Sequence, residues 1–545
     1  MATRIIRSQP GKTPLVRFGG AARRAARWAA ILALPWAAVA PTSAGAADRP
    51  LDLGPAGLPE SRELQSIQPG VTLTRITRGA PGPAAAWVVE VNIPGGGSSP
   101  DPDAPPRSIQ DQSSAEAFAA RLAGAGFPAE AQAVRQPQTA DVPAGVLGYR
   151  VRLRAAFPTQ EAASAAAARL SASGFSGRAW YSGWDGDSTA RGPWTVNVIT
   201  VDPRRFDGTL RGTFGPTLED REKTTELSAL ERANAALNGG FFVFDPAAGA
   251  EGDPAGAGVY RGRLESEPIG DRPVLVLHDR GHGDVVRPSW SASVRLPARR
   301  MALDGVNRVP GLIRNCGGTR DDLVTWRPLH DVTCTDEEEL VLFTPAFGPA
   351  TPSGSGAEAI LDRFGRVLAV LPSRGAALRP GWRSLQATGG LADAVASLRP
   401  GDRVRPRLAL RSAGRRLTGP GATVVNGGPL LVKGGDAHIT QRRDGMHQPS
   451  NPSFDYGWVL QRNPRTFAGT DARGRVLFVT VDGRQLGELG LSIPETAAVA
   501  RSLGMTESIN LDGGGSTAMV IHGSLISRPS DASGERAVGD AIIIR

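Results

Sequence analysis

Apolar and polar residues alternate with a period of two over many short stretches of this chain. Residues 71–76 and 194–201 are clear examples. A β-strand turns successive side chains to opposite faces, so this period predicts strands. Glycine (68 residues) and proline (44 residues) are frequent between the stretches, which indicates turns rather than long helices. The pattern predicts an α+β protein dominated by short strands.

Few stretches have helical periodicity, and those that do carry terminal signals. Residues 492–503 begin with a capping box formed by Ser492 and Glu495, and Gly504 follows the predicted end. A second helix is predicted from Ser228 into Ala235. Helices are therefore expected to be a minor part of the larger domain.

Residues 86–182 contain an internal repeat. The segment 120–127, with Ala-Arg-Leu at its start and Gly-Phe at its end, recurs at 168–175, and each copy follows a strand-like stretch. Each predicted helix also has a capping residue at its N-terminus, namely Ser113 (with Glu116) and Thr159. The unit is therefore a β-α pair used twice, which is typical of one small α+β domain.

This duplicated pattern resembles the sporulation-related repeat (SPOR) family, whose domains bind peptidoglycan glycan strands. The resemblance implies a ferredoxin-like module over residues 71–185, with a flexible insertion at 94–112, and peptidoglycan as a partner. The module is expected to act independently, so that its deletion spares turnover of a small substrate. A structural duplication without a ligand is the alternative. The strand-like stretch at 194 echoes that at 87, so the module could instead follow a first strand of the larger domain, at 70–80.

The first 46 residues predict an export signal. Seven basic residues and no acid precede the apolar stretch 28–40, and Ala44-Gly45-Ala46 supplies small residues for cleavage. We predict a signal peptide over 1–46 and a polar linker over 47–70, with a retained N-terminal anchor as the alternative. The predicted location is secreted or cell-wall associated, without a stable membrane anchor after cleavage.

Export changes how the charge is interpreted. The formal net charge is +9, and subtracting the seven basic residues of the signal leaves about +2. No dense basic patch with interleaved aromatic residues follows. These features exclude nucleic acid as an expected partner.

The chain has two cysteines, Cys316 and Cys334. An even number of cysteines in an oxidising compartment favours a disulfide, and a zinc site would need more ligands than the nearby His330. We therefore predict that these two cysteines are bonded to each other.

Three motifs of the form Asn/Asp-Gly-Gly each follow a short apolar stretch of the larger domain. Adjacent glycines allow backbone N–H groups to converge on an anion, and the leading side chain can accept hydrogen bonds from sugar hydroxyls. Ordinary tight turns are the alternative. We predict one shared site, whose residues from these motifs are Asn238, Gly239, Gly240, Asn426, Gly427, Gly428, Asp512, Gly513, Gly514, Gly515 and Ser516.

Arginine residues accompany these motifs. Arg465 precedes a strand, Arg484 follows one, and Asp531 and Arg536 lie in a late loop. The planar guanidinium group suits bidentate capture of a phosphate, although each arginine taken alone would be expected in solvent. We predict that these side chains contact a phosphate group of the substrate.

The order of the motifs resembles that of the phosphodiester glycosidase family. They are Asn-Gly-Gly-Phe-Phe (238–242), Asn-Gly-Gly-Pro (426–429), Asn-Pro-Arg-Thr (463–466), Val-Asp-Gly-Arg (481–484) and Leu-Asp-Gly-Gly-Gly-Ser (511–516). The resemblance implies a mixed α/β catalytic domain rich in β-strands over residues 190–545. It further implies hydrolysis of a sugar-1-phosphodiester, with release of the sugar, in cell-wall or extracellular polysaccharide material.

Such a reaction passes through an oxocarbenium-like state and needs a carboxylate as nucleophile or base. Asp512 is the first candidate because three glycines follow it, and Asp482 is the second; the sequence does not separate the two roles. Arginine and backbone N–H groups can stabilise the departing phosphate. The predicted catalytic set is therefore Asp512, Asp482, Asn238 and Arg465.

No cofactor or metal is expected. His438, His447 and His522 lack metal-ligand spacing and are expected in solvent. The acidic segment 336–339 could attract calcium, although a solvated turn is favoured. A non-catalytic glycan-binding protein of the cell wall, or a scaffold associated with exopolysaccharide, is the alternative function. The presence of both candidate aspartates favours an enzyme.

Overall fold

The computed structural model describes residues 49–80, 85–94, 104–186, 189–313, 323–324 and 334–545. The predicted signal peptide lies outside the described residues, as does part of the predicted insertion. Within the part of the chain that is described, no helix combines the length and apolar composition needed to cross a membrane.

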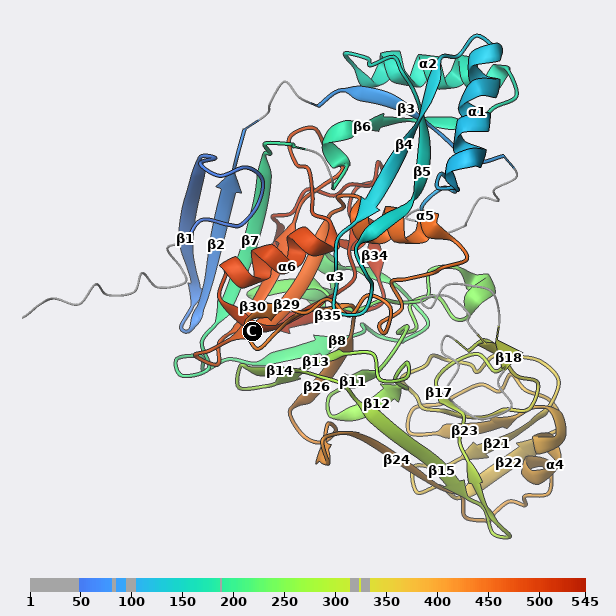
Figure 1. The fold of residues 1–545 in the computed structure, drawn as a ribbon. Coiled ribbons are helices and arrows are strands. Elements are labelled where there is room, and N and C mark those ends of the chain that lie inside the picture. The colour runs from blue at the N-terminus through green and yellow to red at the C-terminus, as the bar shows by residue number, and fades with distance from the viewer. Residues whose placement is uncertain (1–48, 81–84, 95–103, 187–188, 314–322, 325–333) are drawn as a thin grey trace, which may run out of the picture. The chain divides into compact units, whose positions relative to one another are not determined.

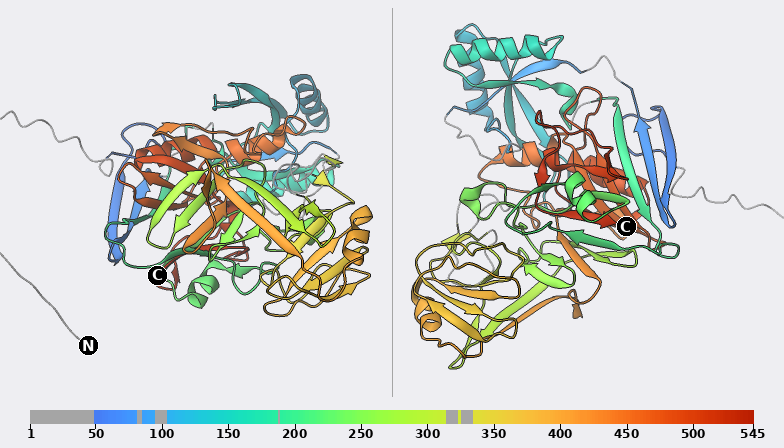
Figure 2. Two further views of the ribbon diagram at one scale, coloured as in Figure 1. Left: turned by 90° about the horizontal axis from the view of Figure 1, so that it is seen from below. Right: turned by 180° about the vertical axis from the view of Figure 1, so that it is seen from behind.

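The largest element is an antiparallel sheet of eight strands (Figure 1). In spatial order its strands are β1 (Glu60–Gln68), β2 (Val71–Arg78), β7 (Trp194–Val201), β30 (Val476–Val481), β29 (Arg465–Asp471), β31 (Met505–Asn510), β27 (Leu430–Lys433) and β28 (Asp436–Ala437). Figure 2 shows β1, β2 and β7 side by side. Since β7 pairs with both β2 and β30, segments from both ends of the chain build one sheet.

Both faces of the central strands of this sheet are buried, because consecutive residues of β7 and β30 are buried and successive side chains point to opposite faces. On one face, Val196 and Val479 share a core with side chains of α6 (Ile493–Ser502). On the other face, Ile199 and Phe478 share a core with two five-stranded sheets.

The two smaller sheets position two of the glycine motifs. One has the order β33 (Ser524–Leu525), β32 (Met519–Ile521), β10 (Ala235–Asn238), β35 (Ala541–Ile544) and β8 (Leu210–Thr213). The other has the order β12 (Arg263–Ser266), β11 (Gly258–Tyr260), β26 (Ala422–Asn426), β13 (Val274–His278) and β14 (His282–Val286). Strands β10 and β26 each end on the asparagine that begins a motif.

The repeat module is a four-stranded antiparallel sheet with two helices on one face (Figure 1). Its elements are β3 (Trp87–Val91), α1 (Gln112–Gly124), β4 (Ala129–Gln136), β5 (Gly145–Leu153), α2 (Gln160–Ala172) and β6 (Gly177–Tyr181), with the strand order β4-β5-β3-β6. Val89 and Val151 of the sheet pack against Leu122 and Leu170 of the helices. The duplicated β-α unit therefore forms one core.

The boundaries of this module differ from the prediction. Residues 60–68, expected within a linker, form β1, and β2 joins the large sheet instead of the module. The reason is burial: Val71 and Ile76 lie in the two cores of the large sheet. The module is therefore inserted between β2 and β7, as the echo between residues 87 and 194 had left open.

Residues 289–416 contribute two more sheets with a core of their own. These are β16 (Arg300–Ala302), β15 (Ser289–Arg295), β24 (Arg405–Ser412) and β25 (Arg415–Arg416), and then β17 (Gly305–Val306), β20 (Leu340–Phe343), β23 (Arg383–Ala387), β21 (Ala357–Leu361) and β22 (Val367–Leu371), with α4 (Ala392–Ala396). Two short pairs are β18 (Leu323–Val324) with β19 (Cys334–Thr335), and β9 (Glu222–Lys223) with β34 (Ala537–Val538).

The predicted disulfide is not decided by the fold. Cys334 lies buried in β19, whereas Cys316 lies outside the described residues. The bond between them therefore remains a prediction.

The sequence signals predicted the helix α6 correctly and the boundaries of α3 incorrectly. The capping box of Ser492 and Glu495 is present. The helix predicted from Ser228 is α3 (Thr224–Leu230), which begins earlier and ends before Ala235. Ala235 instead begins the fully buried strand β10, whose pairing on both sides outweighs a local helical preference.

The caps of the module are a second partial correction. Asp111, and not Ser113, caps α1: its carboxylate accepts a hydrogen bond from the backbone N–H of Ser114 (2.9 Å) and from the hydroxyl of Ser113 (2.7 Å). At α2 the predicted cap, Thr159, accepts from the N–H of Ala162 (3.2 Å).

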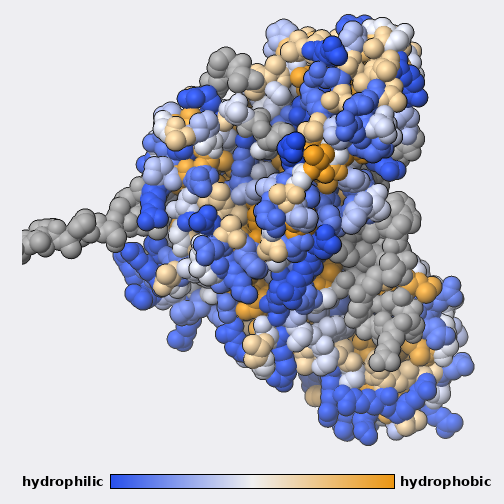
Figure 3. Space-filling view, in the orientation of Figure 1, coloured by the Kyte–Doolittle hydropathy of each residue, from blue (hydrophilic) through white to orange (hydrophobic). Residues whose placement is uncertain are grey.

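Apolar residues on the face in Figure 3 are scattered among hydrophilic ones. The strand-rich α+β class is confirmed.

Candidate active site

Both candidate aspartates lie at one edge of the eight-stranded sheet. Arg465, at the start of β29, pairs with Val481 at the end of β30, so Asp482 follows directly. On the other side of β29, Phe467 pairs with Asn510 at the end of β31. Asp512 therefore leaves the sheet at the same edge as Asp482.

The Asn426 motif reaches the same edge from β27. Leu430, the first residue of β27, pairs with Ile509 of β31. The N–H of Gly428 donates to the carbonyl of Asn510 (2.8 Å), and the side-chain amide of Asn510 returns a bond to the carbonyl of Gly428 (2.9 Å). The antiparallel pairing thus brings segments about 80 residues apart in sequence to one place.

Asn238 connects the edge of this sheet to β10. Its side-chain amide donates to the main-chain carbonyl of Asp512 (2.8 Å), and its side-chain oxygen accepts from the hydroxyl of Thr466 (2.7 Å) and the N–H of Ala518 (3.1 Å). Asn238 is fully buried. The prediction that its side chain meets the substrate is therefore wrong, because these bonds occupy it; Asn238 positions the backbone of Asp512.

Asn426 has a similar internal role. Its side chain is buried and forms two hydrogen bonds with the backbone of Phe241, accepting from the N–H and donating to the carbonyl (both 3.0 Å). The predicted contact between Asn426 and a sugar is thus also corrected. The side chain instead ties the end of β26 to the Asn238 motif.

Three motif glycines use their N–H groups within the protein, and five allow close packing of the motifs. The N–H groups of Gly239 and Gly240 donate to the carbonyl and carboxylate of Asp540 (3.0 and 2.8 Å), and that of Gly514 donates to the carbonyl of Pro464 (2.9 Å). A β-carbon on Gly239, Gly240, Gly427, Gly513 or Gly515 would lie less than 3.0 Å from a neighbouring atom. The glycines are needed because the motifs interlock.

Asp512 is the partly exposed carboxylate of the edge. One of its oxygens accepts from the N–H of Gly513 (2.9 Å). The hydroxyl-bearing Ser516, four residues on, is buried within the short helical turn Gly514–Ser516. Of these motif residues, Asp512 is the one whose charged side chain can meet a ligand from solvent.

Asp482 lies in a different environment. It is 1% exposed, one oxygen accepts from the N–H of Arg528 (3.0 Å), and the other has no hydrogen-bond partner among the described residues. Burial, and to a smaller extent the nearby charge of Glu488, raises the pKa of this carboxyl to about 7, although the hydrogen bond from the N–H of Arg528 acts in the opposite direction. Asp482 can therefore hold a proton near neutral pH.

Two arginines lie beside the aspartates. Arg484 adopts a left-handed backbone (φ 57°), and its guanidinium donates twice to the side-chain oxygen of Asn463 (2.9 and 3.1 Å). Arg536 is paired with Asp531 (2.8 Å), and a β-carbon on Gly515 would collide with both side chains. Arg536 and Asp531 are consequently held close to the Asp512 motif, and Arg484 is held at Asn463.

Arg465 is tied to the main chain beside the site. It is 3% exposed, and its guanidinium donates to the carbonyls of Leu491 and Trp458 (both 2.8 Å). These bonds tie the start of β29 to two neighbouring segments. A phosphate contact by Arg465 stays a prediction.

Two protein-family models match the chain: "Phosphodiester glycosidase" over residues 358–545, and "SPOR domain" over residues 107–179. The first range contains the sheet edge with Asp482 and Asp512 and the second contains both helices of the repeat module. Residues 358–545 therefore resemble the phosphodiester glycosidase family, and residues 107–179 resemble the SPOR domain.

The curated relatives match a short stretch of this chain. The bovine N-acetylglucosamine-1-phosphodiester alpha-N-acetylglucosaminidase is 29% identical over 113 residues, and the mouse enzyme is 30% identical over 113 residues. The match covers 21% of this chain and 21% of the bovine protein. The chain thus aligns with about a fifth of the length of these relatives.

Solved structures extend the similarity to nearly the whole chain. A putative exported protein from Burkholderia pseudomallei is 31% identical with a TM-score of 0.80, covering 91% of this chain and 98% of the other. A hypothetical protein from Synechocystis is 16% identical with a TM-score of 0.51, covering 89% and 79%, and shows similarity of fold alone. The arrangement of glycosidase and SPOR domains therefore has a close structural counterpart.

The sequence analysis missed a buried acid behind the Asn238 motif. Asp540 accepts hydrogen bonds from the hydroxyl of Tyr260 (2.7 Å) and the N–H of Gly240 (2.8 Å). Burial raises the pKa of Asp540 to about 6. No local motif marks Asp540; the Gly-Asp pair before the final apolar strand was the available signal.

His447 was also misjudged. It is only 11% exposed, and its Nδ1 lies 2.5 Å from the buried carboxylate of Asp455. This Asp-His pair lies at α5 (Pro452–Asp455) and the π-helical turn Tyr456–Leu460 that follows it.

The acidic segment 336–339 also differs from the predicted solvated turn, because Glu339 is fully buried and ion-paired with Arg308 (2.8 Å). Among the described residues, no group of three His, Cys, Asp or Glu side chains could hold a metal ion.

Proposed function

We propose that the glycosidase domain hydrolyses a sugar-1-phosphodiester and that the protein works outside the cell, in association with cell-wall or extracellular polysaccharide material. The observation that carries the proposal is the contrast between two aspartates at one sheet edge. Asp512 is partly exposed, whereas Asp482 is buried with a pKa raised to about 7. A buried carboxyl group that keeps its proton near neutral pH, beside a second carboxyl group that solvent reaches, is typical of glycoside hydrolysis.

The proposed roles follow from these environments. The carboxylate of Asp512 acts at the anomeric carbon, as nucleophile or as base for water, while the bond between that carbon and the phosphate oxygen breaks. Arg484 and Arg536 neutralise the departing phosphate. Water supplies the hydroxyl to the sugar, and the protonated Asp482 is a proton source for the phosphate monoester.

The SPOR domain is proposed to bring the enzyme to the wall. The support is its family match and the similarity of the whole chain to a putative exported protein. Peptidoglycan glycan strands are the proposed partner. A pull-down of the full chain with purified peptidoglycan is the test, and absence of the protein from the pellet would count against this assignment.

A non-catalytic glycan-binding protein is the second candidate. The observation that favours it is internal use of polar groups: Asn238 and Asn426 are both buried and hydrogen-bonded within the protein. Such a site would bind a sugar phosphodiester without releasing the sugar. The two candidates differ in one measurable outcome, the appearance of free sugar.

The experiment incubates the full chain with a panel of sugar-1-phosphodiesters and measures free sugar. We expect release by the wild type and a loss of at least ~100-fold in turnover for Asp512→Asn, about 2.7 kcal/mol of transition-state stabilisation. Asp436→Asn, at an exposed position in β28, is the matched control and should retain activity. Binding of the panel without release by the wild type would favour the second candidate.

A further inference from the structure

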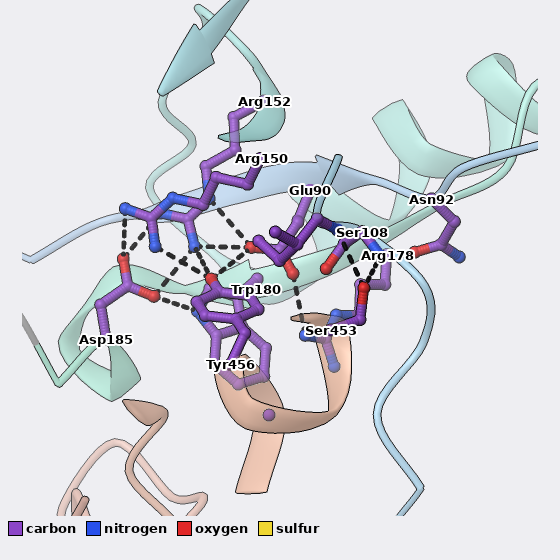
Figure 4. Close-up of polar contacts among 12 residues, drawn as sticks. Glu90, Asn92, Ser108, Arg150, Arg152, Arg178, Trp180, Asp185, Ser453 and Tyr456 are labelled. Atoms are coloured by element: carbon purple, nitrogen blue, oxygen red, sulfur yellow. Dashed lines mark hydrogen bonds and ion pairs between the residues drawn. The ribbon is translucent and has the colours of Figure 1, made fainter. Parts of the chain in front are cut away.

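The SPOR sheet has one face that its own helices do not cover, and this face is charged. Within β5, Arg150 and Arg152 flank Val151, which points into the helix-packed core. Glu90 and Arg152 face each other across paired strands, with the guanidinium of Arg152 2.8 Å from the Glu90 carboxylate. The polar side chains drawn in Figure 4 from this face are Glu90, Arg150, Arg152, Arg178 and Trp180.

The glycosidase domain buries this charged face (Figure 4). The hydroxyl of Tyr456 donates to Glu90 (2.8 Å) and accepts from the guanidinium groups of Arg150 (2.9 Å) and Arg152 (3.3 Å). Tyr456 is 3% exposed and Glu90 is 0% exposed. A single hydroxyl of the glycosidase domain therefore completes the hydrogen bonds of three charged SPOR side chains.

Each acidic side chain in this contact is paired with arginine. Asp185 accepts from Arg152 (2.7 and 2.9 Å) and from the indole of Trp180 (2.8 Å), while Glu90 also pairs with Arg178 (2.9 Å). Burial alone would raise the pKa of Glu90, but the surrounding arginine charges outweigh it and lower the pKa to about 2. Since a buried charge is costly without its partners, the face is suited to remaining docked.

The glycosidase segment 442–462, which contains Tyr456, is hydrogen-bonded to residues of the SPOR region at other points. Asp141, in the loop between β4 and β5, accepts from the N–H groups of Arg442 (3.1 Å) and Arg443 (2.8 Å). The hydroxyl of Ser453 accepts from the N–H groups of Ser108 (2.9 Å) and Ile109 (3.0 Å). At the far end, Arg462 donates from its backbone N–H to the carbonyl of Trp184 and from its guanidinium to that of Gly183 (both 2.8 Å). The segment 442–462 is thus fixed along its length.

This segment in turn supports the proposed active site. The carbonyl of Gly457, next to Tyr456, accepts from the side-chain amide of Asn463 (3.0 Å). The oxygen of the same side chain accepts from Arg484. The carbonyl of Trp458 accepts from Arg465 at the start of β29 (2.8 Å). A continuous set of contacts therefore leads from the SPOR face to Arg484.

We propose that the SPOR domain is a positioning element of the glycosidase domain. Its charged sheet face docks the segment 442–462, and the docked segment fixes Asn463 and, through it, Arg484. The SPOR domain is then a structural part of the active site, contrary to the expectation that its deletion spares turnover. The effect on turnover rests on the proposed function; the effect on the segment does not.

The test compares Tyr456→Phe and Ser453→Ala with wild type in the full chain. Tyr456→Phe keeps the ring and removes the hydroxyl that the charged face shares. Tyr149→Phe is the matched control: Tyr149 lies in the SPOR domain and bonds Gln112 (2.9 Å) away from the docking face. The readouts are hydrogen exchange of backbone amides 457–465 and kcat on a sugar-1-phosphodiester.

We expect exchange in 457–465 to be at least ~5-fold faster in Tyr456→Phe and Ser453→Ala, and unchanged in Tyr149→Phe, because local opening follows the loss of local contacts. The value of kcat should fall in the same two variants. Unchanged exchange in both folded docking variants would overturn the proposal. Faster exchange with unchanged kcat would also overturn it. If no substrate is turned over at all, the exchange result still decides whether the dock fixes the segment, and the proposed function fails separately.

Discussion

The side-chain amide of Asn238 donates to the main-chain carbonyl of Asp512 (2.8 Å), across 274 residues of sequence. This bond joins the end of β10 to the edge of the eight-stranded sheet. It fixes the peptide that carries the partly exposed candidate carboxylate. The position of Asp512 therefore depends on a residue that does not itself meet the substrate.

Replacing Asn238 is expected to disturb both stability and turnover. Asn238→Ala leaves the carbonyl of Asp512 and the hydroxyl of Thr466 without their buried partner, which should lower the free energy of unfolding by about 1–3 kcal/mol. Turnover should fall at least ~10-fold in the folded protein because Asp512 shifts. Denaturant unfolding and kcat measure the two effects. Asn234→Ala is the control, since Asn234 bonds Gln68 away from the edge; equal losses in both variants would contradict a specific role for Asn238.

Gly515 should tolerate no side chain without a cost to function. A β-carbon there would collide with the guanidinium of Arg536 and the carboxylate of Asp531. We expect Gly515→Ala to raise KM for a sugar-1-phosphodiester several-fold, because the displaced Arg536 no longer meets the phosphate. Gly487→Ala, where a β-carbon meets no atom within 4 Å, is the control. Identical KM values for the two variants would exclude Arg536 from phosphate binding.

The raised pKa of Asp482 predicts that stability and turnover depend on pH. Burial raises its pKa in the folded protein from the ordinary value of 3.8 to about 7, so the folded state favours the protonated acid. The stability linked to this group is fully present below pH 3.8 and is lost as pH rises to about 7. Turnover should also fall above about pH 7, because Asp482 then loses the proton that it supplies to the phosphate. In Asp482→Asn the loss of stability between pH 4 and 7 should be smaller; an unchanged profile from thermal unfolding across this range would contradict the assignment.

The disulfide predicted between Cys316 and Cys334 has a direct chemical test. Titration of the denatured, unreduced protein should find no free thiol, and titration after reduction should find two. Since the pair closes a short loop, reduction should lower the free energy of unfolding by about 3 kcal/mol in the chain-entropy model. Two free thiols before reduction would show that the bond is absent.

The sequence was informative where local patterns decide structure. The repeat predicted the SPOR elements, and the motifs at strand ends predicted the region of the site, because strand pairing brings such ends together. It was not informative about side-chain direction: Asn238, Asn426 and Arg465 face inward to satisfy backbone groups of distant segments. The contact between Tyr456 and Glu90 joins residues 366 apart, and no local pattern encodes it.

The central claim is that water attacks the sugar and not the phosphate. Hydrolysis of a sugar-1-phosphodiester in water enriched in ¹⁸O separates the two, because the label enters whichever group is attacked. The account predicts that wild-type protein releases free sugar labelled at its anomeric hydroxyl, together with an unlabelled phosphate monoester, and that Asp512→Asn releases neither at a comparable rate. Label in the phosphate, or release of sugar-1-phosphate, would contradict it.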